Sequence, residues 1–203
     1  MGKLILTSGG YIDGQRGERC DAIIESFSKN KSVLIVDNAT TTGSNVKGLP
    51  ILRSNFSKIA KSVEQLTLTA DNLDKINNYD VLYVTGGDLG PFIELIATSD
   101  LRNAFLRYLE RGGVIIGESA GSMIFGCDLK WAYDIKKGTK PKYDIVMPTH
   151  KGLGIVDINI FPHWNKASID MQEKVAQYEE QNGIKVTRLC DGEFIERDYE
   201  KIK

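Results

Sequence analysis

Short runs of Val, Ile and Leu alternate along the chain with longer segments in which apolar residues recur every three or four positions. The short runs predict strands at 3–7, 32–40, 79–88, 114–118, 153–161, 184–189 and 193–197. The longer segments predict helices at 20–29, 55–66, 89–96, 100–113 and 167–181. Apolar strands separated by helices are typical of a largely parallel sheet that is covered on both faces. We therefore expect a three-layer α/β fold in a single domain, 1–203.

Two local patterns add to this outline. The apolar residues of the segment 55–66 have helical spacing and are expected on one helix face; they are Phe56, Ile59, Ala60 and Val63. The last two predicted strands flank a Cys-Asp-Gly sequence at 190–192. We expect these two strands to pair as an antiparallel hairpin at an edge of the sheet.

Three of the predicted strands end in glycine-rich turns, at 8–10, 86–88 and 117–121. Any one of them could simply permit a tight turn before a helix. In open α/β sheets, however, binding sites gather at the carboxyl ends of the strands. Three such turns at one edge of the sheet therefore indicate a shared pocket.

The third turn has the sequence Gly-Glu-Ser-Ala-Gly and lies between a buried strand and a predicted helix. This is the nucleophile-elbow pattern, in which a sharp turn raises a serine hydroxyl above the sheet. Ser119 is the candidate nucleophile, and the first backbone N–H groups of the helix, starting at Ala120, would face an oxyanion. The alternative for such a turn is a phosphate-binding or purely structural role.

A serine hydroxyl needs a base, and the chain holds only two histidines. His163 directly follows an apolar run, whereas His150 lies in a polar stretch, so His163 is the better candidate. A carboxylate should orient the imidazole ring. The candidates between the serine and the histidine are Asp128, Asp134, Asp144 and Asp157, and the residue pattern alone does not choose among them.

Charge and cysteine content exclude several other classes of function. The formal net charge is −1, which favours neither nucleic acid nor an anionic membrane, and no apolar run approaches the ~20 residues of a membrane span. The three cysteines are far apart and show no metal-binding spacing, so we expect neither a metal site nor a cofactor. A reduced, cytoplasmic setting is the simplest interpretation.

At this point the motifs resemble those of the aspartyl dipeptidase (peptidase E) and cyanophycinase family of serine peptidases. The resemblance rests on "YVTGGDLGPFIELI", "GESAGSM" and "INIFPHWN", in that order, and it covers most of the chain. It implies an α/β fold related to class I glutamine amidotransferases, with a serine at the elbow where those enzymes carry cysteine.

The resemblance also implies roles for individual residues. Ser119 would be the nucleophile and His163 the general base. Asp134, shortly after the elbow helix, matches the position of the acidic member in the dipeptidases, although some relatives use a glutamate elsewhere. The Gly86-Gly87 pair matches the loop that completes the oxyanion hole, so a backbone N–H of Gly87 or Asp88 would act with that of Ala120. The family commonly has asparagine after this pair, and Asp88 departs from that pattern.

The expected substrate is a short peptide with an N-terminal aspartate. The segment 128–151 holds six lysines against three aspartates, which gives a charge of +3 in a chain of net charge −1. A positive rim would attract an acidic substrate, whereas the alternative is an ordinary solvated loop. Two other functions remain open: another serine hydrolase on this scaffold, such as an esterase or an acidic-polymer peptidase, and a non-catalytic protein that binds a small ligand. A homodimer is compatible with the sequence, but no residue pattern selects it.

Overall fold

A computed structural model describes residues 1–11, 18–40, 47–136 and 148–202 of the chain. Its main sheet has the strand order β3-β2-β4-β5-β1-β8. The first five of these strands pair in parallel, and β8 pairs antiparallel with β1. Their bounds are β1 Lys3–Thr7, β2 Ser32–Val36, β3 Ser62–Leu66, β4 Val81–Val84, β5 Val114–Glu118 and β8 Phe194–Asp198. The α/β fold with a mostly parallel sheet is thus confirmed.

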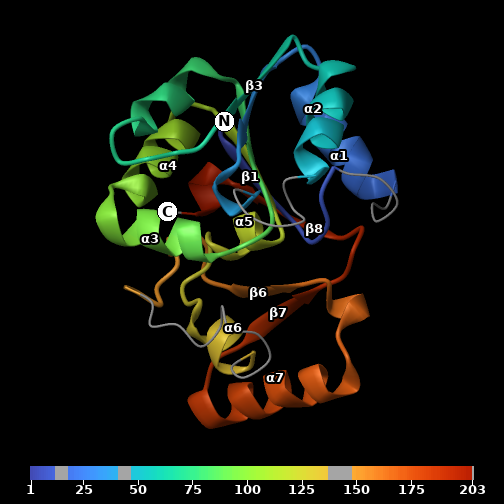
Figure 1. Cartoon of the computed structure of the whole chain (residues 1–203), viewed down its shortest axis with the longest axis vertical. Coiled ribbons are helices and arrows are strands. Elements are labelled where there is room, and N and C mark those ends of the chain that lie inside the picture. Colours follow the sequence, from blue (N-terminus) through green and yellow to red (C-terminus); the bar gives the residue numbers. More distant parts are fainter. Residues whose placement is uncertain (12–17, 41–46, 137–147, 203) are drawn as a thin grey trace.

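Helices cover both faces of this sheet (Figure 1). On one face lie α1 (Glu18–Ser28) and α2 (Gly48–Ser57), which bury apolar residues such as Ile24 and Phe56 against the sheet. On the other face lie α3 (Gly90–Thr98) and α4 (Leu101–Glu110). Pro91 lies in the first turn of α3, where proline is well tolerated because an N–H at that position would have no partner within the helix.

A smaller unit lies beside the main sheet, next to the short helix α5 (Ala120–Met123), in the lower half of Figure 1. It consists of a two-stranded parallel sheet with the helices α6 and α7 near it. The bounds are α6 Lys130–Asp134, β6 Asn159–Pro162, α7 Ile169–Asn182 and β7 Val186–Leu189. Strand β6 of this unit ends at Pro162, directly before His163.

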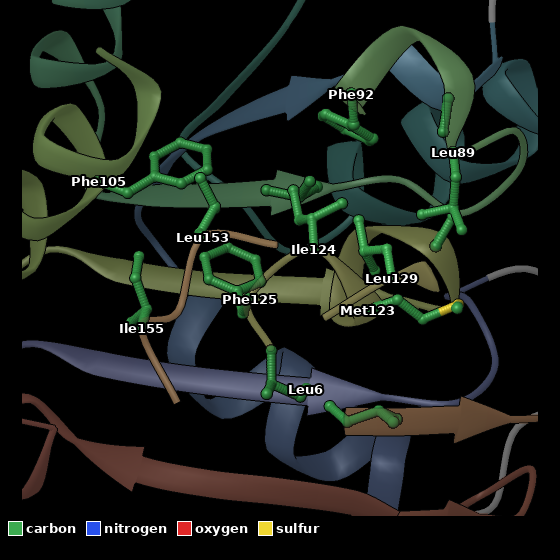
Figure 2. Packing of buried hydrophobic residues seen from close by; sticks show 14 of the residues in the cluster. Leu6, Leu89, Phe92, Phe105, Met123, Ile124, Phe125, Leu129, Leu153 and Ile155 are labelled. Atoms are coloured by element: carbon green, nitrogen blue, oxygen red, sulfur yellow. The ribbon is translucent and has the colours of Figure 1, made fainter. Parts of the chain in front are cut away.

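The main apolar core joins α4 to the chain that follows α5 (Figure 2). The rings of Phe105 and Phe125 stack with their centroids 5.5 Å apart, and both side chains are fully buried. Leu153 and Ile155 pack beside them, and their backbone N–H groups donate to the carbonyl oxygens of Ile124 and Phe125 at 2.7 and 3.0 Å. This contact anchors the chain that leads to β6 against the end of the elbow helix.

The predicted helix at 55–66 is wrong. Helix α2 ends at Ser57, and the chain turns and enters β3 at Ser62. Phe56 belongs to the buried face of α2, but Ile59 and Ala60 lie in the turn, where both backbone N–H groups donate to the Phe56 carbonyl oxygen. The four apolar residues that suggested one helix face thus come from the end of a helix, a turn and a strand, and their spacing resembles that of a helix only by coincidence.

The predicted C-terminal hairpin is also wrong, although both of its strands exist. Strand β7 pairs in parallel with β6, and β8 pairs with β1 of the main sheet. The Cys-Asp-Gly turn at 190–192 therefore connects two different sheets. Strand pairing depends on tertiary contacts as well as on the turn. Here β8 hydrogen-bonds to β1 and becomes the edge strand of the main sheet. The predicted strand at 153–161 likewise contributes only its end, as β6, to the smaller sheet.

Replacement of Phe125 by alanine tests the core described above. We expect Phe125→Ala to lower the free energy of unfolding by about 3–5 kcal/mol, because a buried ring is lost and its cavity collapses only in part. Urea unfolding followed by circular dichroism measures this change. Ile51→Ala, at a position where 41% of the side chain is exposed on α2, should stay within about 0.5 kcal/mol of wild type. Equal losses in both variants would contradict this description of the core.

Candidate active site

Ser119 lies in a strained turn between β5 and α5. Its backbone has φ 48° and ψ −110°, a region that residues with a side chain rarely adopt and that costs about 1–3 kcal/mol. The turn is held from both sides: the Ser119 N–H donates to the Thr7 carbonyl oxygen at 3.0 Å, and the Ser119 carbonyl oxygen accepts from the N–H groups of Ser122 and Met123. This is the geometry of a nucleophile elbow, as the sequence predicts.

The second glycine of the motif is needed because the elbow helix approaches the neighbouring strand very closely. A Cβ atom added at Gly121 would lie 2.2 Å from the Val84 carbonyl oxygen. The position of a Cβ atom is fixed by the backbone of α5, and the carbonyl oxygen belongs to the backbone of β4. The clash could therefore be relieved only by displacing one of these two elements. Glycine at this position thus lets the helix begin directly beside the main sheet.

His163 meets Ser119 from the other sheet. It directly follows β6, and its own φ of 59° turns the chain out of that strand. The ring atom Nε2 lies 3.1 Å from Ser119 Oγ, within hydrogen-bond range. The predicted pairing of these two residues is therefore present in the structure, with one partner supplied by each sheet.

Asp191 holds the opposite side of the imidazole ring. Its Oδ1 atom lies 2.6 Å from His163 Nδ1, and only 7% of its side chain is exposed. Ser8, at the end of β1, ties the pair together, because its Oγ donates to Asp191 Oδ1 at 2.9 Å and accepts from the His163 backbone N–H at 2.7 Å. Lys166 Nζ lies 2.7 Å from Asp191 Oδ2. Ser119, His163 and Asp191 thus form a continuous chain of polar contacts.

The charge of Asp191 is stabilised by this environment. Burial pushes the pKa of its carboxyl group upwards, but hydrogen bonds from Lys166, His163 and Ser8 outweigh that effect. The resulting pKa lies below the usual range of an aspartate, so the group is ionised at neutral pH. An ionised Asp191 accepts a hydrogen bond from the Nδ1–H group of His163, so that Nε2 is left unprotonated and can accept the proton of Ser119.

Asp134, the predicted orienting acid, does not contact His163. Its carboxylate pairs with Lys130 one turn earlier on α6, and it also interacts with the Tyr178 hydroxyl on α7. The structure therefore corrects the prediction, and Asp191 takes the position next to the imidazole. The physical reason is that α6 directs Asp134 toward α7 and away from the end of β6.

Asp128, Asp157 and the second histidine, His150, make their contacts away from Ser119. Asp128 accepts from the Lys130 backbone N–H, and Asp157 lies against Cys127. His150 is exposed, and its carbonyl oxygen accepts from the Leu129 N–H. Asp144 lies outside the described residues.

The three N–H groups predicted for an oxyanion hole differ in whether they already have a hydrogen-bond partner. Ala120 is the first residue of α5, so its N–H has no partner within the helix. Within the described ranges, the N–H of Gly87 also makes no hydrogen bond, and both residues line the pocket at Ser119. The Asp88 N–H, in contrast, donates to the Ala39 carbonyl oxygen at 2.9 Å. This corrects the prediction for Asp88 and leaves Ala120 and Gly87 as the available donors.

Ser119 and His163 open into a pocket of about 390 Å³. The pocket is mostly apolar, with Met123, Tyr133 and Phe161 among the residues that line it, but Lys136 and Lys166 also contribute to its wall. Lys136 Nζ lies 5.6 Å from the centre of the Phe161 ring. Of the other lysines in the predicted basic segment, those at 137, 140 and 142 lie outside the described residues.

Two further findings concern the described part of the chain. No group of three or more His, Cys, Asp or Glu side chains there could hold a metal ion. No helix there is long and apolar enough to cross a membrane. Neither finding bears on the chemistry of the serine.

The sequence prediction misses Asp191 because it considers only acids between the serine and the histidine. A signal is present: Asp191 comes two residues after a predicted strand, at the carboxyl end of that strand, where polar side chains often form sites. The same residue precedes Gly192, and this Asp-Gly pair also suits the hairpin turn that the sequence predicts. Chain order alone does not identify the acid of a triad, because triads occur in several orders.

Comparison with known proteins places this geometry in context. The model of peptidase family S51 matches residues 4–203. An uncharacterized peptidase of Listeria innocua is 26% identical over 160 residues, which cover 76% of this chain and 75% of that protein. An uncharacterized peptidase of Listeria monocytogenes is 23% identical over 145 residues, covering 70% and 69%.

Two solved structures share the fold. A protein from Listeria monocytogenes EGD-e that carries the provisional name peptidase E superposes with a TM-score of 0.72, with 20% identity and 98% of each chain covered. A peptidase from an acI-B1 Actinobacterium superposes with a TM-score of 0.69, with 14% identity, covering 97% of this chain and 83% of that one. At these identities the likeness concerns the arrangement of helices and strands.

The reactivity of Ser119 toward a fluorophosphonate tests which aspartate supports the histidine. We expect Asp191→Asn to slow labelling by about 10⁴-fold, because an amide no longer favours the tautomer that leaves Nε2 unprotonated. Asp134→Asn is the matched control and should label at the wild-type rate, since Asp134 contacts Lys130 instead. Mass spectrometry of the labelled peptide gives the rates. Slow labelling of the Asp134 variant with normal labelling of the Asp191 variant would reverse the assignment.

Proposed function

The chain belongs to peptidase family S51, and from that premise we propose that it is a serine peptidase with Ser119 as its nucleophile. The observation that carries the proposal is the contact chain from Ser119 Oγ through the His163 ring to Asp191, at 3.1 and 2.6 Å. A hydroxyl, an imidazole and a buried carboxylate in that order have the geometry of an activated serine. The family supports a peptidase, and the contact chain supports the serine type.

The proposed reaction uses groups that already face one another. Ser119 Oγ attacks the scissile carbonyl carbon while His163 Nε2 takes the hydroxyl proton. The ionised Asp191 stabilises the imidazolium that forms. The N–H groups of Ala120 and Gly87 donate to the oxyanion of the tetrahedral intermediate.

Collapse of that intermediate completes the first half of the reaction. His163 gives its proton to the leaving amine, and an acyl-enzyme remains on Ser119. A water molecule, deprotonated by His163, then attacks the acyl group. The second tetrahedral intermediate expels Ser119 Oγ, which regains its proton from His163, and the acid product leaves.

We further propose that the substrate is a short peptide with an N-terminal aspartate. A pocket of about 390 Å³ suits a small ligand and leaves little room for a folded chain. Lys136 and Lys166 offer ammonium groups at its wall, which would attract the carboxylates of such a peptide. The carboxylate of Asp88, at the pocket beside Gly87, is placed to receive a peptide's amino group.

Hydrolysis of three dipeptides tests the reaction and the substrate together. We expect wild type to hydrolyse Asp-Leu in preference to Glu-Leu and Leu-Leu, because both the amino group and the side-chain carboxylate find partners in the pocket. Ser119→Ala should lose about 10⁶-fold in kcat, since no nucleophile remains. Release of leucine measured by chromatography gives the rates.

A panel of simple esters, measured with the same two proteins, separates the peptidase from an esterase. Ester cleavage without dipeptide cleavage would replace the peptidase proposal by that of another serine hydrolase. Cleavage by Ser119→Ala at the wild-type rate would remove Ser119 from the reaction altogether.

The lysines of the pocket provide the test of acidic specificity. We expect Lys136→Met to reduce kcat/KM for Asp-Leu by about 10- to 100-fold and to leave Leu-Leu unchanged, because a hydrogen bond to a charged group contributes about 1.5–3 kcal/mol. Lys130→Met is the control, because Lys130 pairs with Asp134 on α6. An equal loss for Asp-Leu and Leu-Leu would show that Lys136 does not recognise the acidic group.

A further inference from the structure

The carboxyl group of Glu118, the residue just before the nucleophile, lies among three turns at the carboxyl ends of the strands. Its Oε2 atom accepts from the Tyr83 hydroxyl at 2.9 Å. That hydroxyl in turn accepts from the Tyr11 backbone N–H at 2.8 Å, so its own proton is directed to Glu118. The carboxyl group also interacts with the backbone N–H of Gly86. Neither the proposed reaction nor the pocket uses this group.

The glycine turns at Gly10 and Gly86 approach the Glu118 carboxyl group so closely that a side chain at either position would meet it. A Cβ atom at Gly10 would lie 2.3 Å from Glu118 Oε1. A Cβ atom at Gly86 would lie 3.0 Å from the same oxygen and 2.9 Å from the Ser119 Cβ. The backbone of the turn at 86–88 therefore packs directly against both the carboxyl group and the nucleophile.

The turn at 86–88 is held at both of its ends. The Gly86 backbone lies against the Glu118 carboxyl group, with which its N–H interacts, and the Asp88 N–H donates to the Ala39 carbonyl oxygen at 2.9 Å. Gly87 lies between these two attachments with φ 137°, and its N–H is the one proposed for the oxyanion hole. A donor that is fixed before the reaction stabilises an oxyanion better than one that must first be ordered.

We propose that Glu118 is a positioning residue that fixes the Gly87 N–H of the oxyanion hole relative to Ser119 by holding the preceding residue, Gly86. This inference rests on the proposed function. Glu118 acts through the loop and does not touch the substrate. Glu118 is the last residue of β5 and directly precedes Ser119, so the oxyanion donor and the serine hydroxyl move as one body.

The charge of Glu118 is compatible with this role. Burial raises the pKa of its carboxyl group above the usual range, although the hydrogen bonds from Tyr83 and Gly86 favour the charged form. A carboxyl group that is more readily neutral opposes a nearby oxyanion less than a fully ionised one would. The pKa of Tyr83 is raised well above its usual value by burial and by Glu118, so Tyr83 stays a hydrogen-bond donor.

Replacement of Glu118 by methionine tests the proposal. Glu118→Met fills a similar space but accepts no hydrogen bond, so we expect kcat for Asp-Leu to fall by about 10- to 100-fold with KM within about twofold of wild type. Glu118→Gln keeps one acceptor oxygen and should restore part of the lost kcat. Glu25→Met is the matched control, because Glu25 accepts from the Tyr11 hydroxyl at 2.7 Å, on the far side of the same network, and should behave as wild type.

Three results would overturn the proposal. One is wild-type kcat in Glu118→Met, another is a rise in KM that accounts for the whole loss, and the third is an equal loss in Glu25→Met. Thermal unfolding monitors whether each variant is folded. If Glu118→Met does not fold, Glu118→Gln decides alone: a lower kcat with unchanged KM supports the proposal, and wild-type values overturn it.

A second measurement separates this proposal from the proposed function. Amide hydrogen exchange of the glycines, followed by NMR on ¹⁵N-glycine-labelled protein, needs no substrate. We expect the Gly86 amide to exchange at least about tenfold faster in Glu118→Met than in wild type, and unchanged exchange would overturn the positioning role. If wild type cleaves no dipeptide and no fluorophosphonate labels Ser119, the serine-peptidase proposal fails, while the exchange rate still tests the contact between Glu118 and Gly86.

Discussion

The strained backbone of Ser119 is the constraint on which the site depends. A positive φ at a residue with a side chain persists only where the surroundings impose it, and here they do so from two directions. The Thr7 carbonyl oxygen holds the Ser119 N–H, and the first turn of α5 uses the Ser119 carbonyl oxygen as its acceptor. The same turn that lifts the hydroxyl off the main sheet also exposes the Ala120 N–H. The proposed nucleophile and the proposed oxyanion donor are thus two consequences of one backbone conformation.

The remaining members of the site come from the smaller sheet, so the junction between the two sheets must be precise. Ser8 provides it, because one hydroxyl contacts both the His163 backbone and the Asp191 carboxylate. Ser8 is buried at the end of β1, the strand that pairs with β5 and thereby with the elbow. Ser8 therefore links the position of the imidazole to the main sheet, and so to Ser119. The apolar contact of Leu153 and Ile155 with the chain after α5 supports the same junction from the other side (Figure 2).

Sequence reasoning finds the parts of the fold that depend on local signals. The strands β1, β2, β4 and β5 are apolar runs because both of their faces are covered, and the elbow follows from the spacing of small residues around Ser119. Asp191 escapes prediction because its position depends on which strand β7 pairs with, and the Asp-Gly pair after β7 equally suits a hairpin. The prediction for the Asp88 N–H fails for a similar reason: its acceptor, Ala39, is distant in sequence and no local pattern shows it. What the sequence lacks in each case is the identity of a long-range partner.

The balance of charge around Ser119 explains why an acidic neighbourhood is compatible with a reaction that develops negative charge. Three carboxyl groups lie near Ser119, but each is compensated differently. Asp191 is paired with Lys166, and that ion pair keeps its charge on the far side of the imidazole, where it favours the imidazolium. Glu118 is partly buried, and burial raises the pKa of its carboxyl group, which favours the neutral form. Asp88 accepts from the Gly90 N–H at the start of α3, where the helix dipole favours a negative group.

Lys166, with 47% of its side chain exposed at the pocket, retains N–H donors that a bound carboxylate could share with Asp191. An acidic substrate would then bind an ammonium group that already pairs with the acid of the proposed triad, so that specificity and catalysis would depend on the same cation.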